Sequence, residues 1–423
     1  MGAAIQSGTG TATRHVPVVG VPSLARQMAE ELLSFLRDPA RSAPDQYEVV
    51  DTRLLALKGL ARLIDEQFSG MTDELRSIQQ WFREETNPVF LTSGLFQRVR
   101  TWPHGYPGDY VTLEEIYRNS PGFVGVGAHL DRYLLSRTLP VAVRSRMRIL
   151  SRLLRERAAV EGASGNWLNL GCGSCRELLA LEDDGAKRTI QCVDLDQRAL
   201  DYSKRLLAGK NAGVLRFLPE NALRFSRAER NLQRFGAFST IYSAALFDYL
   251  ESGTLVRLLN GLYRSLRDGG ILIAPFKDKT RYETYDYHWL SQWHFFLQRG
   301  EEEYREVLAK AGIPERGVRI ERDDTGVILF VLISKSAAGR APQETGPSAA
   351  ETESPGTVWR VDRGNRPNEE SRGDSHEEDQ RILGLLDQMI ATAKQVNGSI
   401  SNLCSRTAHL HAQCVSVLSE SPE

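Results

Sequence analysis

The chain has 423 residues, with 53 basic and 54 acidic side chains and a formal net charge of −1. This length leaves room for more than one domain, because a domain commonly holds roughly 100–200 residues. The balanced charge excludes a global attraction to nucleic acid, and no apolar run reaches the roughly 18 residues that predict a membrane span. Five cysteines without the spacing of a disulfide framework favour a reducing compartment, so we expect a cytoplasmic protein.

The first 160 residues predict a helical unit behind a short disordered segment. Residues 1–20 carry Gly, Ser, Thr and Ala without a period, which is typical of disorder. Over residues 21–160, apolar residues recur at intervals of three and four, which indicates amphipathic helices, about three of them between Ser23 and Gln97. Breaks between these helices are expected at Asp38-Pro39, Ala43-Pro44, Gly70 and Asn87-Pro88.

The stretch TWPHGYPGDY, residues 101–110, crowds prolines, glycines and aromatic residues into one loop before another expected helix. Loops of this composition often carry function, and we consider His104, Tyr106 and Asp109 candidates for binding a small molecule. In the alternative, the prolines and glycines only shape a turn, the aromatic residues pack, and Asp109 caps the following helix.

A further amphipathic segment spans residues 129–156, with a break expected at Pro140. It carries Arg144, Arg146 and Arg148, and a solvated surface is the favoured interpretation of these charges. One of them can instead face a carboxylate, and we include Arg144 among the candidate substrate-binding residues.

Residues 161–335 alternate strand and helix signals, with helices expected from Ser174, over 197–208 and over 254–270. The strands are expected at 167–170, 189–196, 214–218, 238–244, 269–276, 318–324 and 326–334. Apolar strands that alternate with helices predict a parallel sheet covered on both faces. The last two strands meet across a short turn and predict an antiparallel hairpin. The predicted fold class is therefore α/β, with a Rossmann-like seven-stranded sheet.

The run NWLNLGCGSCRELL, residues 166–179, places a Gly-x-Gly turn at the carboxyl end of the first strand, where doubly wound sheets bind ligands. Gly171 and Gly173 let the backbone pass close to such a ligand. Asp194 stands 21 residues beyond Gly173, at the tip of the second strand, where a carboxylate can accept both hydroxyls of a ribose. No third glycine follows to admit a pyrophosphate, so the pattern predicts a nucleoside without phosphates.

These residues resemble class I S-adenosylmethionine-dependent methyltransferases over about 165–335. The hydrophobic-Asn-Leu-Gly-Cys-Gly turn is similar to that family's first motif, with Asn169 in place of the usual acidic residue. The resemblance implies S-adenosylmethionine as cofactor, with Asp194 on the ribose and Leu195 against the adenine. It also implies these cofactor-binding residues: Gly171, Cys172, Gly173, Glu177, Asn221, Ala222, Ser243 and Ala244.

Three stretches, PHGYPGDY, LDRYLLSRTLPVAVRSR and YHWLSQWHFFLQRGEEEYREVLAKAG, resemble a bacterial subgroup that makes 3-hydroxy fatty acid methyl esters. We therefore expect carboxyl O-methylation of a small or fatty acid in a biosynthetic or signalling pathway. The insert after the fifth strand departs from the Trp-x-Leu-x-Tyr-Arg-Thr pattern of that subgroup. Two alternatives stay open: N-methylation of an amine-containing small molecule, and a non-catalytic regulator that binds S-adenosylmethionine.

The insert, residues 277–296, lies where this fold builds its acceptor pocket, and we expect it to form the acceptor site with the N-terminal helical unit. Tyr282, Tyr285 and His288 are the candidate catalytic residues, and a structural role for His288 is equally open. Trp289 is a candidate pocket wall or core residue. Asp248, after the fourth strand, either faces the methyl group or caps the next helix.

Two cysteines, Cys172 and Cys175, match a Cys-x-x-Cys pattern. Both lie within the glycine turn and no second cysteine pair accompanies them, so we predict neither redox chemistry nor a metal site. Residues 336–378 are poor in apolar residues and predict a disordered linker. Residues 379–418 show apolar positions at four-three spacing, which favours a coiled coil that self-associates or recruits a partner protein. The alternative is a helix that packs back on the N-terminal unit.

Overall fold

The computed structural model describes residues 21–122, 124–162, 164–182, 187–210, 212–293 and 297–336. The predictions made for residues 1–20, for the linker from residue 337 onward and for residues 379–418 lie outside these ranges.

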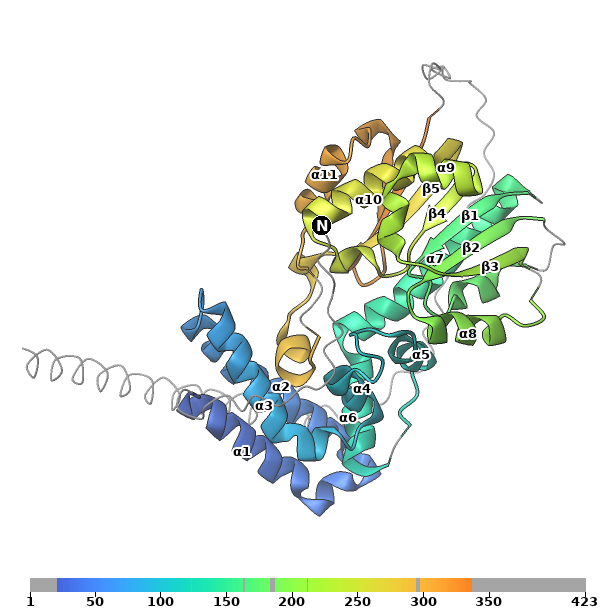
Figure 1. The fold of residues 1–423 in the computed structure, drawn as a ribbon. Coiled ribbons are helices and arrows are strands. Elements are labelled where there is room, and N and C mark those ends of the chain that lie inside the picture. Colours follow the sequence, from blue (N-terminus) through green and yellow to red (C-terminus); the bar gives the residue numbers. More distant parts are fainter. Residues whose placement is uncertain are drawn as a thin grey trace, which may run out of the picture.

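An all-helical region precedes the sheet, as the sequence predicts (Figure 1). Its helices are α1 (Ser23–Arg37), α2 (Tyr47–Gln67), α3 (Thr72–Phe90), α4 (Gly94–Thr101), α5 (Tyr110–Arg118), α6 (Gly125–Ser136) and α7 (Thr138–Glu161). The break predicted at Asn87-Pro88 is wrong, because Pro88 lies inside α3. The buried Phe90, two residues after Pro88, packs edge-on against Phe96 of α4, with 4.8 Å between ring centroids.

The sheet contains seven strands in the order β3-β2-β1-β4-β5-β7-β6. The strands are β1 (Asn166–Leu170), β2 (Thr189–Asp194), β3 (Val214–Pro219), β4 (Phe238–Tyr242), β5 (Leu266–Lys277), β6 (Val318–Arg322) and β7 (Ile328–Ser334). The first five strands pair in parallel, whereas β7 pairs antiparallel with both β5 and β6. This arrangement confirms the predicted α/β class and the antiparallel last hairpin.

Helices cover both faces of the sheet (Figure 1). On one face, Trp167 of β1 shares an apolar cluster with residues of α7 and of α8 (Gln197–Leu206). On the other face, Leu168 shares a second cluster with residues of α10 (Ser252–Ser265) and of α11 (Glu301–Lys310). Successive residues of a strand point to opposite faces, so β1 supplies both clusters through the neighbouring Trp167 and Leu168.

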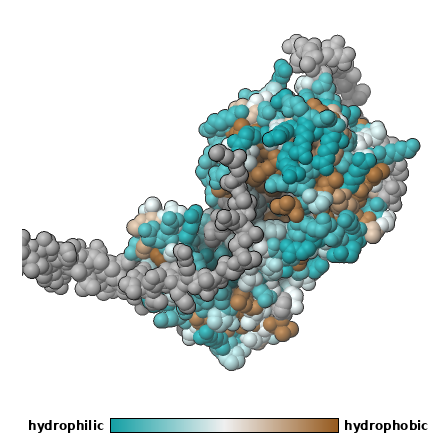
Figure 2. Space-filling view, viewed as in Figure 1, coloured by the Kyte–Doolittle hydropathy of each residue, from teal (hydrophilic) through white to brown (hydrophobic). Residues whose placement is uncertain are grey.

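The surface of the covering helices is hydrophilic. Figure 2 shows mainly hydrophilic residues over α10 and over α9 (Ala228–Phe235), while leucines on the inner side of α10 are fully buried. Within the described residues, no helix combines the length and the apolar character that crossing a bilayer requires.

Two element boundaries differ from the sequence-based expectation. The helix expected over 254–270 ends at Ser265, because Leu266 pairs with Phe238 of β4 and starts β5 before the Gly269-Gly270 pair. The segment expected to be helical from Ser174 is a short 3-10 turn, Arg176–Ala180. Sheet pairing therefore overrides the helix-stop signal of the two glycines.

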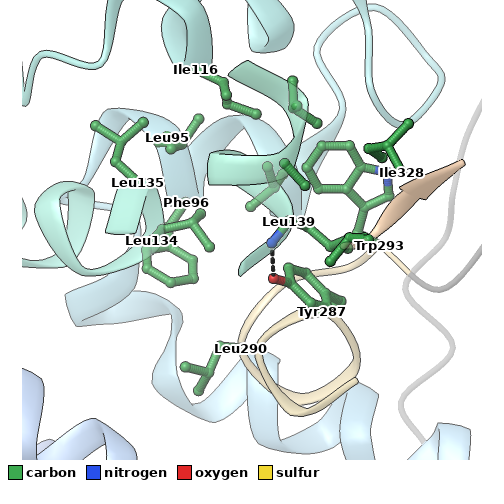
Figure 3. Close-up of a cluster of buried hydrophobic side chains, with 14 of the residues drawn as sticks. Leu95, Phe96, Ile116, Leu134, Leu135, Leu139, Tyr287, Leu290, Trp293 and Ile328 are labelled. Atoms are coloured by element: carbon green, nitrogen blue, oxygen red, sulfur yellow. Dashed lines mark hydrogen bonds between the residues drawn. The ribbon is translucent and has the colours of Figure 1, made fainter. Parts of the chain in front are cut away.

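The insert after β5 returns to the helical region and completes its core (Figure 1). A π-helical turn, Asp286–Leu290, packs on α3, and the indole nitrogen of Trp289 donates a 3.0 Å hydrogen bond to Asp65. Figure 3 shows Tyr287 and Leu290 beside α6 and α7, where the backbone N–H of Leu139 donates to the Tyr287 hydroxyl at 2.8 Å. The insert thus joins the sheet to the helices that precede it.

Candidate functional site

The glycine turn after β1 exposes backbone at the carboxyl end of the sheet. Gly171 and Gly173 have φ angles of +59° and +54°, a conformation that favours glycine. A Cβ atom added to Gly171 would lie 3.3 Å from Cβ of Leu246, so a side chain there would crowd the segment that follows β4. The N–H of Cys172 donates to the carbonyl of Val193 at 3.0 Å, which fixes the turn to β2.

Asp194 ends β2 and braces the glycine turn. Its Oδ2 accepts a 2.8 Å hydrogen bond from the N–H of Gly173, and its Oδ1 accepts a 2.9 Å bond from the N–H of Asp196. Burial raises the pKa of the Asp194 carboxyl, and the two backbone N–H groups oppose that rise. Each carboxylate oxygen has a second lone pair, so Asp194 can still accept hydrogen bonds from a ligand.

A buried polar network lies behind the turn. The Nδ2 of Asn169 donates to Oε1 of Glu177 at 2.8 Å, and the Tyr242 hydroxyl donates to the same oxygen at 3.0 Å. Burial raises the pKa of Glu177 to about 8. The Oδ1 of Asn169 is buried without a hydrogen-bond partner, and an unsatisfied buried acceptor is costly. This oxygen is therefore suited to a hydrogen-bond donor on a bound molecule.

The aromatic loop before α5 lies on the turn that follows β2. The Tyr106 hydroxyl donates to Oδ2 of Asp196 at 3.1 Å, and Nδ1 of His104 lies 3.2 Å from the same oxygen. Partial burial raises the pKa of Asp196, but hydrogen bonds from Arg198, His104 and Tyr106 outweigh it and bring that pKa to about 2. His104 and Tyr106 thus lie at the end of the sheet where β2 ends.

A second contact ties the same helical region to the glycine turn. Arg176, directly after the turn, forms a bidentate ion pair with the buried Glu114 of α5, with an Nε–Oε1 distance of 2.8 Å. The Tyr202 hydroxyl of α8 donates to Oε2 of Glu114 at 2.9 Å. Sequence analysis missed Glu114 and Arg176, because no local pattern links positions 62 residues apart.

A buried ion pair lies at the carboxyl ends of β4 and β5. The Nζ of Lys277 lies 2.5 Å from Oδ2 of Asp248, and the Tyr304 hydroxyl donates to Oδ1 of Asp248 at 3.0 Å. The N–H of Lys277 also donates to Oδ1, at 3.2 Å. Burial lowers the pKa of Lys277, although the Asp248 carboxylate opposes that effect. Asp248 is therefore committed to Lys277 and Tyr304 and does not cap a helix.

Aromatic side chains surround this ion pair. The Trp293 indole N–H donates to the Tyr249 hydroxyl at 3.1 Å, and Lys277 lies over the Tyr249 ring at 5.7 Å from its centroid. A Cβ atom on Gly108 would lie 2.9 Å from the Tyr249 hydroxyl oxygen, so the loop before α5 also reaches this end of the sheet. One loop therefore touches both the β2 side and the β4 side of the site.

The candidate residues of the insert separate in space. Tyr282 donates to Oε1 of Gln298 at 2.7 Å, and the neighbouring Asp248 contributes to raising its pKa after the larger effect of burial. Tyr285 donates to the carbonyl of Leu54 in α2 at 3.4 Å, and Trp289 is fully buried against α3. The carbonyl of His288 accepts a hydrogen bond from Arg83 of α3. Of these four residues, Tyr282 is the one beside the Asp248–Lys277 pair.

Two further candidates make structural contacts. Asp109 accepts from the N–H groups of Val111 and Thr112 at 2.9 and 3.2 Å, so it caps α5, as the alternative interpretation held. It also pairs with Arg98 at 2.6 Å. Arg144 donates to the carbonyl of Leu135 at 2.9 Å.

The remaining residues implied by the resemblance lie along the same edge of the sheet. Leu195 is 72% exposed directly after β2, which leaves its side chain available to a ligand. Asn221 follows β3 and accepts from the N–H of Leu223 at 2.9 Å. Ser243 is buried directly after β4, and Ala244 is partly buried beside it. Cys172 and Cys175 are buried free thiols.

Comparison with known proteins identifies the domain that contains this site. Residues 168–270 match the family model of a methyltransferase domain. No curated protein matches the chain.

Solved structures with a similar fold include three bacterial proteins. A possible exported protein from Bordetella parapertussis is 18% identical, with 78% of this chain and 100% of that chain covered and a TM-score of 0.45. The 1,6-didemethyltoxoflavin-N1-methyltransferase from Burkholderia thailandensis, solved with S-adenosylhomocysteine, is 17% identical, with 45% and 79% covered and a TM-score of 0.33. The N-methyltransferase NodS from Bradyrhizobium japonicum is 16% identical, with 45% and 97% covered and a TM-score of 0.32. None of these similarities supports the subgroup that makes 3-hydroxy fatty acid methyl esters.

The matched residues fit S-adenosylmethionine. The glycine turn presents backbone without side chains, Asp194 can accept from ribose hydroxyls, and the unpaired Oδ1 of Asn169 suits an ammonium group. The family match covers the glycine turn, Asp194 and the strands that hold them. The chain therefore carries a methyltransferase domain, and it is an S-adenosylmethionine-dependent methyltransferase.

Proposed function

We propose that the enzyme transfers the methyl group of S-adenosylmethionine to the carboxylate of a small or fatty acid. The observation that supports this acceptor is the pairing of Asp248 with Lys277 at the carboxyl ends of β4 and β5. An amine or phenol acceptor must lose a proton during the reaction and needs a proton acceptor nearby. A carboxylate is already ionised at neutral pH and needs none. Because the Asp248 carboxylate is held by Lys277 and Tyr304, this end of the site favours an acceptor that arrives ionised.

The donor would lie along the carboxyl ends of β1, β2 and β3. Asp194 would accept from the ribose, Leu195 would pack on the adenine, and Asn221 would lie near the adenine amino group. Asn169 would accept from the methionine ammonium through its unpaired Oδ1. His104 and Tyr106 would cover this side through Asp196.

The bound donor supplies a methyl group on a positively charged sulfur, which is an electrophile without further activation. The residues of this chain then need to bring the acceptor oxygen into line with that methyl group and to exclude water. The loop before α5 serves both needs, since it contacts Asp196 on the donor side and Tyr249 on the other side. Tyr282, beside the Asp248–Lys277 pair, would orient the acceptor.

The test is methyl transfer from labelled S-adenosylmethionine to a matched panel of octanoate, decanoate, 3-hydroxydecanoate, octylamine and octanamide. The proposed reaction produces label in a methyl ester, which mild base releases as labelled methanol. Label that survives base treatment and appears with octylamine would instead identify an N-methyltransferase. Donor binding without turnover on any acceptor would favour the non-catalytic regulator. If calorimetry shows no affinity for S-adenosylhomocysteine, the proposed donor site is wrong.

A further inference from the structure

Arg146 is a buried arginine on the apolar side of α7. Its side chain is 3% exposed, and it continues the stripe of buried residues formed by Val143, Ile149 and Leu150, which lie three and four positions away along the helix. Its Nε has no hydrogen-bond partner. Throughout the part of the chain that the structure describes, no carboxylate forms an ion pair with Arg146.

The groups around Arg146 belong to the acceptor side of the site. Its charge acts on three neighbours: Tyr117 of α5, Tyr249 after β4 and Lys277 at the end of β5. Burial raises the pKa of Tyr249 to about 12 and that of Tyr117 above its usual range, and in both cases Arg146 opposes the rise. Burial lowers the pKa of Lys277, the Asp248 carboxylate raises it, and the charge of Arg146 adds to the lowering. Arg146 is therefore hydrogen-bonded to Tyr117 of α5 and close enough to Tyr249 and Lys277 for its charge to affect both residues.

The charges of Arg146, Lys277 and Asp248 do not balance. Lys277 and Asp248 neutralise each other as an ion pair, which leaves the guanidinium of Arg146 without a counter-charge. An isolated buried charge is expensive, and folded proteins compensate it with a partner. The missing partner is therefore an anion that the folded chain does not itself supply among its described residues.

We propose that Arg146 binds the carboxylate of a small molecule held at the carboxyl ends of β4 and β5. A planar guanidinium matches a carboxylate with two parallel N–H donors, and such charge-assisted bonds are among the strongest in proteins. The Tyr117 hydroxyl, which forms a hydrogen bond with Arg146, and the Tyr249 hydroxyl lie near this guanidinium. This assignment rests on the proposed function, in which the acceptor is a carboxylic acid.

Two bound molecules can supply that carboxylate: the acceptor and the methionine part of the donor. The position of Arg146 favours the acceptor, because its neighbours are Tyr249, after β4, and Lys277, the last residue of β5. The residues suited to the nucleoside lie instead at the ends of β1, β2 and β3. A test needs one arm for each source.

The acceptor arm measures octanoate and its uncharged analogue octanamide on the full-length enzyme saturated with S-adenosylhomocysteine. Wild-type enzyme is expected to bind octanoate at least about tenfold more tightly than octanamide, and Arg146→Gln is expected to remove that preference. Arg146→Lys keeps the charge but not the planar fork, so it should retain part of the preference. The control is Arg148→Gln, a substitution on the same helix at a side chain that is 65% exposed and paired with Asp324.

The donor arm compares S-adenosylhomocysteine with 5′-methylthioadenosine, which lacks the amino-acid part. If the carboxylate belongs to the donor, Arg146→Gln weakens S-adenosylhomocysteine by about tenfold or more and leaves 5′-methylthioadenosine unchanged. That result would support the carboxylate site and assign it to the donor.

Each arm compares the affinities of two ligands on the same variant. A general loss of stability in Arg146→Gln would affect both ligands and therefore would not produce the expected change in their ratio. If Arg146→Gln does not fold, the same ratios are measured on Arg146→Lys and on Tyr249→Phe. Unchanged ratios in both arms would overturn the assignment of Arg146. The proposed function has its own contradicting outcome. If labelled methyl groups appear on an amine while the Arg146-dependent preference for a carboxylate persists, carboxyl O-methylation is wrong and the carboxylate site remains.

Discussion

The hydroxyl of Tyr106 donates a 3.1 Å hydrogen bond to Asp196, two positions beyond the aspartate that braces the glycine turn. Tyr106 comes from the loop that precedes α5. A segment outside the sheet therefore lies against the turn that follows β2. The guanidinium of Arg198 donates back to the carbonyl of His104 at 3.1 Å, which holds the loop at a second point. This edge of the sheet is therefore lined by residues that lie on both sides of α7 in the sequence.

Tyr106→Phe is expected to weaken S-adenosylhomocysteine binding by roughly 5- to 30-fold, because the lost bond to a charged acceptor is worth about 1–2 kcal/mol. Calorimetry on the purified enzyme measures this change. Tyr47→Phe is the matched control, since Tyr47 donates to Asp51 within the helical region at 3.1 Å. Equal affinities for Tyr106→Phe and wild type would show that the loop does not support the donor.

Asp194→Asn is expected to weaken S-adenosylhomocysteine by roughly 1–3 kcal/mol, because an amide loses the charge-assisted bonds to the ribose and to the N–H of Gly173. Asp201→Asn, at a position of α8 where the carboxylate side chain is 46% exposed, serves as the control. The same calorimetric titration compares the variants. An unchanged dissociation constant for Asp194→Asn would remove this residue from the donor site.

Glu177→Gln tests the buried network behind the turn through the pH dependence of stability. The pKa of Glu177 rises from 4.5 to about 8, so between these pH values the folded enzyme holds a proton that the unfolded chain has released. The free energy of unfolding contributed by Glu177 is therefore greatest below pH 4.5 and falls as the pH rises toward 8.

Urea unfolding of the wild type and of Glu177→Gln measures this effect. As the pH is raised, the free energy of unfolding of Glu177→Gln should increase relative to that of the wild type by on the order of a few kcal/mol. Glu156→Gln, at an exposed position of α7, should show no such trend. Parallel curves for wild type and Glu177→Gln would contradict the burial-raised pKa.

Lys277→Met is expected to destabilise the fold by roughly 3–5 kcal/mol, because it leaves the Asp248 carboxylate buried without its partner. The double variant Asp248→Asn/Lys277→Met removes both charges and should recover at least about 1 kcal/mol relative to the sum of the single changes. Chemical denaturation of the four proteins completes the double-mutant cycle. Additive losses would mean that the two side chains do not interact in solution.

The central strands were predictable from sequence because they are largely apolar and buried, as in β4 and β7. The edge strands β3 and β6 are partly exposed and include charged residues, and β6 was predictable because apolar residues alternate with charged ones. The placement of the glycine turn beside Asp194 was predictable because the two lie at the carboxyl ends of consecutive, paired parallel strands. The ends of helices were less predictable. Pro88 lies inside α3 near its packed end, where Phe90 contacts Phe96. Gly269 lies inside β5, because the pairing of Leu266 with Phe238 overrides the local helix-stop signal.

The acceptor side was less predictable, because its residues come from segments far apart in the chain. Arg144, Arg146 and Arg148 carry the same charge, and only their place on the helix separates them. Two positions along a helix correspond to a rotation of about 200°, so Arg146 lies opposite its two neighbours. Its coincidence with the apolar stripe of Val143 and Ile149 was a signal in the sequence that could have identified it.

The indole of Trp289 fills the core beside Phe82 and bonds to Asp65, 224 positions earlier in the chain. The N-terminal helices therefore lack part of their own interior until the ribosome has made the segment that follows β5. A fragment that ends at residue 160 would expose the surface around Phe82 to water. Those helices are consequently unsuited to expression as a separate module, and they reach their final packing late in synthesis, together with the last strands.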